Sequence, residues 1–165
     1  MLMLITLLAA CTPAEDAPEG SGNVVVYAIR HVEKDTTAGV QDPKLTDEGT
    51  ARAQVLATFM ADVDLSAVYS TPYSRTRDTV QPVADSHGLE VNTQWAEGGI
   101  ALSAHILATH HHETVIAAGH SNTVPALIAG LGGPVITIEE SSYGELWVVT
   151  VVDGVATAVK TPFED

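Results

Sequence analysis

Short runs of apolar, β-branched residues alternate along this chain with segments of helical periodicity, and this alternation restricts the fold more than any other feature. Continuous apolar runs of this length are typical of strands that are buried on both faces of a parallel sheet. Strands that alternate with helices indicate an α/β domain of three layers (α/β/α), in which a mostly parallel central sheet lies between two layers of helices. The predicted strands are residues 24–29, 67–70, 89–91, 114–118 and 145–152.

Capping and turn residues predict where the helices begin and end. Thr46 or Asp47 is suited to cap the start of a helix, and Gly88 is suited to the position just after the end of another. Asp153-Gly154 is typical of a type I′ turn, which adds an antiparallel C-terminal hairpin and makes the sheet mixed. The predicted helices begin near residue 47 and span about residues 72–86, 100–109 and 123–131.

Polar residues follow three of the predicted strands at the point where each strand ends. These residues are Arg30-His31, Ser70-Thr71 and Gly119-His120. The carboxyl ends of the strands in an open α/β sheet meet at one edge and form the ligand crevice. We therefore expect the three segments to share one site.

The charge of the chain restricts its partners. The 165 residues suit one domain, and the formal net charge is −14, with 7 Lys+Arg against 21 Asp+Glu. A nucleic-acid partner is excluded, because binding to a phosphate backbone needs a basic face. An acidic surface also repels anionic substrates at long range, so phosphate chemistry has to depend on a few well-placed cations. Three of the four arginines follow predicted strands: Arg30, Arg75 and Arg77.

Four separate segments, taken in order, resemble a known family. Together they resemble the signatures of the phosphoglycerate-mutase-like branch of the histidine phosphatase superfamily, in particular the short, cap-less bacterial phosphohistidine phosphatases. The resemblance covers roughly residues 24 to 152. It implies the phosphoglycerate-mutase-like fold and a phosphoric monoester hydrolase that needs no metal and no other cofactor. The segments are Arg30-His31-Val32-Glu33-Lys34, Leu45-Thr46-Asp47-Glu48-Gly49, residues 70–79 (STPYSRTRDT) and Gly119-His120-Ser121-Asn122-Thr123.

The resemblance assigns a role to each of the polar residues at the strand ends. His31 is the nucleophile that becomes phosphorylated, and we expect a backbone carbonyl to hold its other ring nitrogen. Arg30 and Arg75 bind phosphoryl oxygens through planar forks, and His120 supplies a further donor, with Asn122 as an additional one. Taken singly, each arginine could instead be an ion-pair partner and His120 a core histidine. Arg77, two residues after Arg75 on a helix, points elsewhere.

Two positions depart from the pattern of the family. Val32 stands where many relatives have Gly, which puts close approach of the backbone in doubt. Many members place a leaving-group acid in the segment that here is residues 92–104, where Glu97 is the one acidic residue. Glu97 is therefore the candidate acid and Glu33 a lesser one, although short phosphohistidine phosphatases manage without such an acid. A catalytic acid would need burial or a raised pKa to stay protonated.

The first 22 residues predict export and lipid attachment. Residues 1–11 form an apolar run that is too short to span a bilayer and ends in Leu8-Ala9-Ala10-Cys11, which resembles a lipoprotein signal segment. Residues 12–22 are rich in Pro, Glu and Gly and predict a flexible tether to a phosphatase domain at residues 23–165. The expected location is the cell envelope, in the periplasm, with membrane contact only through a lipidated Cys11. The lack of positive charge at the start departs from the usual signal peptide.

Three functions remain open on this basis. The first is hydrolysis of a phosphorylated small molecule, lipid or protein through a phosphohistidine at His31. The second is a lipoprotein of the same fold that binds phosphate without turnover, and the intact His31 argues against it because binding needs no nucleophile. The third is a metal-binding lipoprotein that uses His105 and the histidines at 110–112, although adjacent histidines on a helix cannot all face one ion. Short connections predict an open site without a cap, which disfavours a true mutase.

Overall fold

The buried run at the start of the domain forms the central strand of a six-stranded sheet. The computed structural model describes residues 23–95 and 98–163, and β1 (Val24–Arg30) lies inside this sheet with its side chains alternating toward two cores. β1 pairs in parallel with β4 and antiparallel with β5, and β2 pairs in parallel with both β3 and β4. The sheet order is β3 (Val91–Asn92), β2 (Ala67–Ser70), β4 (Thr114–Gly119), β1, β5 (Leu146–Val152) and β6 (Val155–Thr161).

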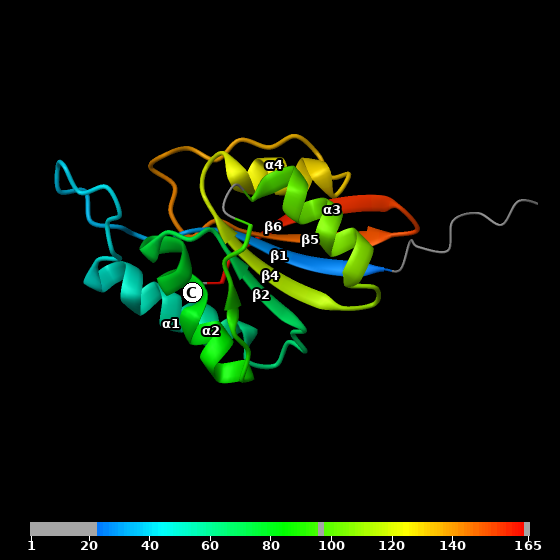
Figure 1. The fold of residues 1–165 in the computed structure, drawn as a ribbon, viewed down its shortest axis with the longest axis horizontal. Coiled ribbons are helices and arrows are strands. Elements are labelled where there is room, and N and C mark those ends of the chain that lie inside the picture. The colour runs from blue at the N-terminus through cyan, green and yellow to red at the C-terminus, as the bar shows by residue number, and fades with distance from the viewer. Residues whose placement is uncertain (1–22, 96–97, 164–165) are drawn as a thin grey trace, which may run out of the picture.

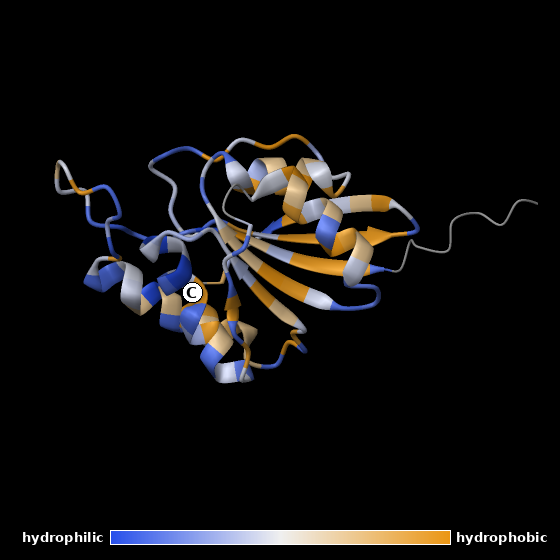
Figure 2. Ribbon diagram, in the orientation of Figure 1, coloured by the Kyte–Doolittle hydropathy of each residue, from blue (hydrophilic) through white to orange (hydrophobic). Residues whose placement is uncertain are grey.

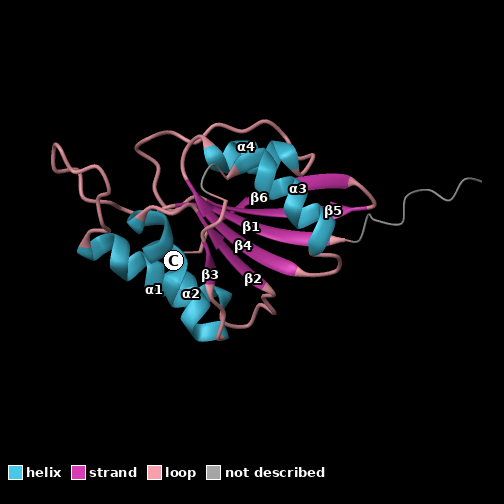
Figure 3. Ribbon diagram, viewed as in Figure 1, coloured by secondary structure: helices cyan, strands magenta, loops and turns pink. Residues whose placement is uncertain are grey.

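Two pairs of helices cover the two faces of the sheet (Figures 1 and 3). α1 (Asp47–Met60) packs against α2 (Ser74–His87) on one face. α3 (Gly99–Thr109) packs against α4 (Thr123–Gly130) on the other. The predicted three-layer α/β architecture, with a mostly parallel sheet and an antiparallel C-terminal hairpin, is confirmed.

Local signals in the sequence account for the observed ends of these elements. The side chain of Thr46 accepts a hydrogen bond from the backbone N–H of Gly49 and caps α1. Gly88 follows α2 with φ of 65°, a left-handed conformation that glycine adopts without steric cost. Asp153 and Gly154 have φ of 49° and 77°, as the predicted type I′ turn between β5 and β6 requires.

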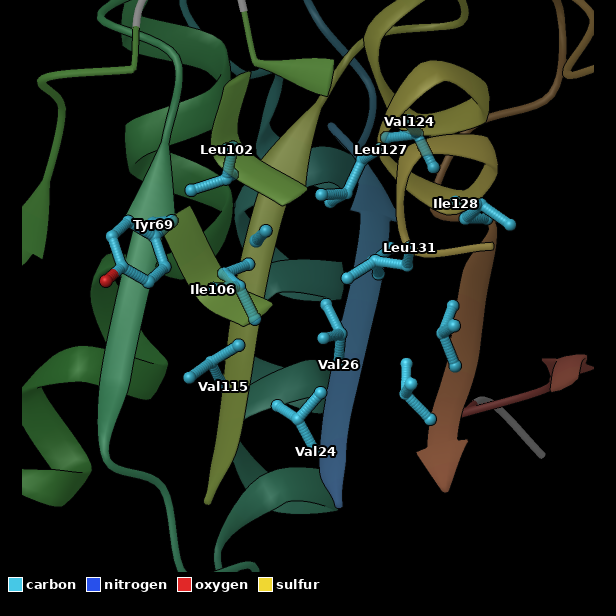
Figure 4. Close-up of a cluster of buried hydrophobic side chains, with 14 of the residues drawn as sticks. Val24, Val26, Tyr69, Leu102, Ile106, Val115, Val124, Leu127, Ile128 and Leu131 are labelled. Carbon is cyan, nitrogen blue, oxygen red and sulfur yellow. The ribbon is translucent and has the colours of Figure 1, made fainter. Parts of the chain in front are cut away.

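The sheet separates two apolar cores. In Figure 2 the strands and the inner sides of the helices carry most of the hydrophobic residues, whereas the outer sides of α1 and α2 are hydrophilic. Figure 4 shows the core on the α3–α4 face, where Val26 and Val115 from the sheet meet Ile106 and Leu127 from the helices. Each such side chain contributes about 1.5–3 kcal/mol on full burial, so this packing holds the sheet rigid under the site.

The strand register brings the predicted site segments to one edge of the sheet. Arg30 lies opposite Gly119 in the pairing of β1 with β4, and Ser70 lies opposite Ala118 in the pairing of β2 with β4. The polar residues that follow these three parallel strands therefore emerge together, as expected.

The predictions made for residues 1–22 remain predictions. Within residues 23–95 and 98–163, no helix combines the length and hydrophobicity needed to cross a membrane. The predicted signal segment, the tether and Cys11 lie outside the described residues.

Candidate active site

An open cleft of about 670 Å³ lies at the carboxyl ends of the parallel strands. Its walls come from the loop after β1, the start of α2, the turn between β4 and α4, and the long connection from α4 to β5. The side chain of Tyr73 at its mouth is 43% exposed, and that of Glu140 is 80% exposed. The lining residues are His31, Lys34, Gln41, Tyr73, Arg75, His120, Ser121, Asn122, Thr123 and Glu140.

His31 has the geometry of a neutral nucleophile. It is 2% exposed, and its Nδ1 lies 2.8 Å from the carbonyl oxygen of Val32. A carbonyl only accepts, so Nδ1 carries the proton and donates it, and Nε2 keeps a free lone pair. Burial lowers the pKa of His31 to about 4, with contributions from Arg30 and His120, although the Val32 carbonyl opposes the shift. The imidazole is therefore uncharged at neutral pH.

Arg30 is buried beside His31, does not line the cleft, and holds a loop that is distant in the sequence. Its Nη1 donates to the carbonyl oxygens of Glu139 at 2.6 Å and Ser142 at 2.5 Å, and its Nη2 donates to the carbonyl of Glu140 at 2.9 Å. The Tyr143 ring lies 4.7 Å from the guanidinium carbon. Most of the guanidinium hydrogens that the sequence analysis assigned to phosphate are therefore bonded to backbone carbonyls of the protein. Nη2 also donates to Oε2 of the Glu140 side chain at 3.2 Å, and the buried Nε has no hydrogen-bond partner among the described residues.

Arg75 lies at the other side of the cleft and is held from two directions. Its guanidinium carbon stacks 4.5 Å from the centre of the Tyr73 ring, and its Nη1 lies 3.8 Å from an oxygen of Asp42. Asp42 also accepts hydrogen bonds from the backbone N–H and the hydroxyl of Ser74, which fixes the start of α2. The Nε of Arg75 is buried without a hydrogen-bond partner in the described part of the chain. This arrangement leaves guanidinium donors available to an anion in the cleft.

His120 is oriented by a chain of hydroxyl groups. The single hydrogen of the Thr76 hydroxyl is directed to the carbonyls of Thr71 and Tyr73, at 3.0 and 2.9 Å. Thr71 Oγ1 must then donate to Thr76 across 2.7 Å and accept from His120 Nε2 across 2.9 Å. Burial, followed by Arg75 and Arg30, lowers the pKa of His120 to about 4. Nε2 is thus occupied, and His120 donates to a phosphate only through Nδ1, once that nitrogen is protonated.

These two histidines make the stability of the fold depend on pH. Between about pH 4 and 6.5 the unfolded chain binds more protons at these positions than the folded chain, so the free energy of unfolding falls as the solution is acidified through this window. For His31 the loss is on the order of 2–3 kcal/mol. In denaturant titrations, the free energy of unfolding of the parent should fall between pH 7 and pH 4.5. In His31→Gln it should fall by about 2–3 kcal/mol less. Equal losses would contradict the assignment, and His111→Gln, at an exposed position, is the control.

The other predicted residues divide into three groups. Asn122 lines the mouth of the cleft and is exposed. Glu33 pairs with Arg52 at 2.8 Å and does not line the cleft, so the structure gives no support to its role as an acid. Val32 is fully buried and does not line the cleft. Glu97 lies outside the described residues.

Sequence reasoning missed several residues of the cleft. Lys34 and Tyr73 lie within the segments that resemble the family signatures, close in sequence to His31 and Arg75, so the sequence offered a signal for both. It offered none for Glu140, which lies in an irregular loop that returns to Arg30 across 110 positions. A Cβ at Gly49 would overlap the carbonyl of Glu33. The absence of a side chain at Gly49 therefore allows the start of α1 to lie close to the segment after β1.

Two of the four histidines proposed as metal ligands, His105 and His110, form a hydrogen-bonded network with Tyr69. Tyr69 Oη lies 3.2 Å from His105 Nε2 and 2.6 Å from His110 Nε2, and its hydroxyl points out of the apolar core (Figure 4). His110 Nδ1 lies 2.6 Å from a carboxylate oxygen of Glu113. Among the described residues, no three His, Cys, Asp or Glu side chains are arranged to hold a metal ion. The network satisfies the polar end of a tyrosine that is otherwise buried.

Comparison with known proteins agrees with this architecture. Residues 26–97 match the histidine phosphatase superfamily (branch 1). A segment of 73 residues is 33% identical to the uncharacterised protein Rv0525 of Mycobacterium tuberculosis, and it covers 41% of this chain and 36% of that protein. The chain therefore matches about a third of the length of this curated relative.

Solved structures share the fold over most of the chain. The protein histidine phosphatase SixA complexed with tungstate superposes with a TM-score of 0.69 at 21% identity, covering 84% of this chain and 97% of SixA. Phosphoglycerate mutase from Bacillus anthracis gives a TM-score of 0.66 at 15% identity, covering 86% and 94% of the two chains. Residues 26–97 are thus similar to branch 1 of the histidine phosphatase superfamily, and most of the chain has the fold of these solved structures.

Proposed function

We propose that this protein is a phosphomonoester hydrolase that works through a phosphohistidine intermediate on His31. The observation that carries the proposal is the hydrogen bond of 2.8 Å from Nδ1 of His31 to the Val32 carbonyl. It fixes the tautomer in which Nε2 has a free lone pair, and the pKa of about 4 keeps that lone pair unprotonated at neutral pH. Arg75 and Arg30 supply positive charge around the same cleft.

The reaction proceeds in two displacements. Nε2 of His31 attacks phosphorus, the bond from phosphorus to the leaving oxygen breaks, and the leaving oxygen takes a proton from solvent or from an acid of the site to become the alcohol. Water then attacks phosphorus, the bond to Nε2 breaks, and inorganic phosphate leaves the neutral imidazole, with one proton of the water on the phosphate and the other released to solvent. The guanidinium groups stabilise the charge that spreads over the equatorial oxygens in both transition states.

The supply of the leaving-group proton limits the choice of substrate. Glu140 is the single carboxylate among the described residues that line the cleft, and its pKa is lowered, first by the hydrogen bond from Ser121. A group that is ionised at neutral pH is a poor acid. We therefore propose that the enzyme favours leaving groups that depart with little help, with Glu97 kept as a candidate acid.

The shape of the mouth supports an accessible phosphate as the substrate. Tyr73 and Glu140, at the rim, are 43% and 80% exposed, so no lid of described residues closes over them. A phosphate on a small molecule, a lipid headgroup or a protein side chain can reach such a site. Enclosure of the phosphorylated histidine, which a mutase needs to exclude water, has no support in this geometry.

We also propose that the enzyme acts at the cell envelope, anchored through a lipidated Cys11. Support comes from the sequence alone: an apolar segment that ends in Leu8-Ala9-Ala10-Cys11, followed by a polar tether. Labelled palmitate should be incorporated into the full chain in a bacterial host and not into the Cys11→Ser variant. Equal labelling of the two would remove the anchor from the proposal.

Rapid quenching of the purified protein with an aryl phosphate tests the mechanism. We expect phosphate to become attached to the protein within the first turnover, in a bond that survives base and is lost in acid, as for a phosphorylated imidazole. A protein that binds phosphate but never releases the phenol or becomes labelled would instead be the phosphate-binding lipoprotein of the same fold.

A further inference from the structure

The carboxylate of Glu140 occupies donors that a substrate phosphate would need. Its Oε2 accepts from Arg30 Nη2 at 3.2 Å, and its Oε1 accepts from the hydroxyl of Ser121. Ser121 is adjacent to His120, and both line the same cleft. A carboxylate is an oxyanion, so it presents to these donors the same chemistry as a phosphoryl oxygen.

The charges around Glu140 are those of the site. The hydrogen bond from Ser121 lowers the pKa of Glu140, and Arg30 and Lys34 lower it further, while burial opposes the shift. Glu140 in turn raises the pKa of His120, against the larger effect of burial. An ionised carboxylate therefore lies within the field of the cations that serve the phosphate.

The backbone around Glu140 is held from inside the protein, whereas its side chain lies mostly in solvent. Three carbonyls, those of Glu139, Glu140 and Ser142, accept hydrogen bonds from Arg30, and these bonds hold the backbone of the loop independently of the Glu140 side chain. The Glu140 side chain is 80% exposed and can swing outward. Arg30 is buried and does not line the cleft, so a phosphate can reach the edge formed by Nε and Nη2 only by displacing this carboxylate; the Nε there has no hydrogen-bond partner among the described residues.

We propose that Glu140 is a specificity-determining residue that competes with phosphate for Arg30 and, once displaced, rejects substrates whose leaving group carries a second negative charge. The inference rests on the proposed function. In-line attack by His31 sends the leaving group away from Nε2, toward the mouth where the displaced carboxylate remains tethered. Neutral and cationic leaving groups are accepted there, whereas leaving groups with a carboxylate or a further phosphate are repelled.

Three aryl phosphates whose leaving groups differ in charge test the specificity: phenyl phosphate, 4-carboxyphenyl phosphate and 4-(aminomethyl)phenyl phosphate. In Glu140→Gln we expect kcat/KM for the carboxylated ester, relative to phenyl phosphate, to rise about two- to fivefold over the parent, and the same ratio for the amine to fall. Taking each ratio within one protein removes differences in leaving-group reactivity. Glu139→Gln is the matched control, because it removes the same charge from the same loop and no hydrogen bond or ion pair of that side chain is found among the described residues.

Binding of inorganic phosphate tests the competition without any turnover. Glu140→Gln should bind inorganic phosphate about two- to fivefold more tightly than the parent in calorimetry, and Glu139→Gln should change the Kd less. The binding measurement tests the competition even in a protein that shows no hydrolysis. Failure of the competition between Glu140 and phosphate can therefore be distinguished from failure of the proposed function. Unchanged ratios and an unchanged Kd in Glu140→Gln would overturn the proposal. So would a fall in kcat confined to poor leaving groups, which would make Glu140 the acid.

Discussion

Replacing His31 with Ala is expected to lower kcat on any phosphomonoester by at least about 10⁴-fold, because the variant has no nucleophile to form the covalent intermediate. No other imidazole of the cleft can take over. His120 directs its Nε2 to Thr71, and its position is fixed by this bond. Acid-labile phosphate on the quenched protein should disappear together with the turnover.

The variant should nevertheless bind inorganic phosphate with an affinity close to that of the parent. Arg30 and Arg75 remain, and the bonds from Arg30 to the loop do not depend on His31. Far-ultraviolet circular dichroism establishes that His31→Ala is folded, and His31→Gln, which keeps most of the volume of the buried ring, is the second variant should the first unfold. His111→Ala, at an exposed position, is the control. A folded His31 variant that turns over or becomes labelled like the parent would refute the mechanism.

The parts of the site that the sequence predicts are those that follow from local rules. The end of a buried strand can be recognised from the apolar run that precedes it, so the positions of Arg30, His31 and His120 followed from β1 and β4. The start of α1 followed in the same way from the cap formed by Thr46. The expected carbonyl partner of His31 is its own neighbour, Val32.

The parts that could not be predicted depend on contacts between distant segments. The sequence analysis assigned the planar fork of Arg30 to phosphate, whereas three carbonyls of residues 139–142 use most of its hydrogens. That loop has no periodicity and no turn signature, so nothing local shows that it returns to β1. The roles of Arg30 and Glu140 therefore became visible only in the folded chain, where a cation at the site also supports the wall of the cleft.

Arg75→Ala is expected to lower kcat/KM by about 10²–10³-fold, because it removes charge-assisted donors from the transition state. Arg75→Lys should recover only a small part of this loss, since an ammonium keeps the charge but cannot bind two oxygens in one plane. The matched control is Arg77→Ala. Arg77 carries the same charge on the same helix, is exposed and does not line the cleft, so its loss should change kcat/KM no more than a few-fold.

Arg75 also contacts groups that shape the cleft, and a structural role has to be separated from a catalytic one. Its guanidinium stacks on Tyr73 and lies near Asp42, which holds the start of α2. If Arg75 acted only through this framework, Asp42→Asn would lower activity as much as Arg75→Ala, and both variants would lose thermal stability together. Direct contact with the phosphoryl group predicts a different result: Arg75→Ala weakens the binding of inorganic phosphate and slows formation of the phosphohistidine, whereas Asp42→Asn leaves both close to the parent. Equal losses in Arg75→Ala and Arg77→Ala would show that general positive charge, and not a donor positioned at the phosphorus, is what the cleft requires.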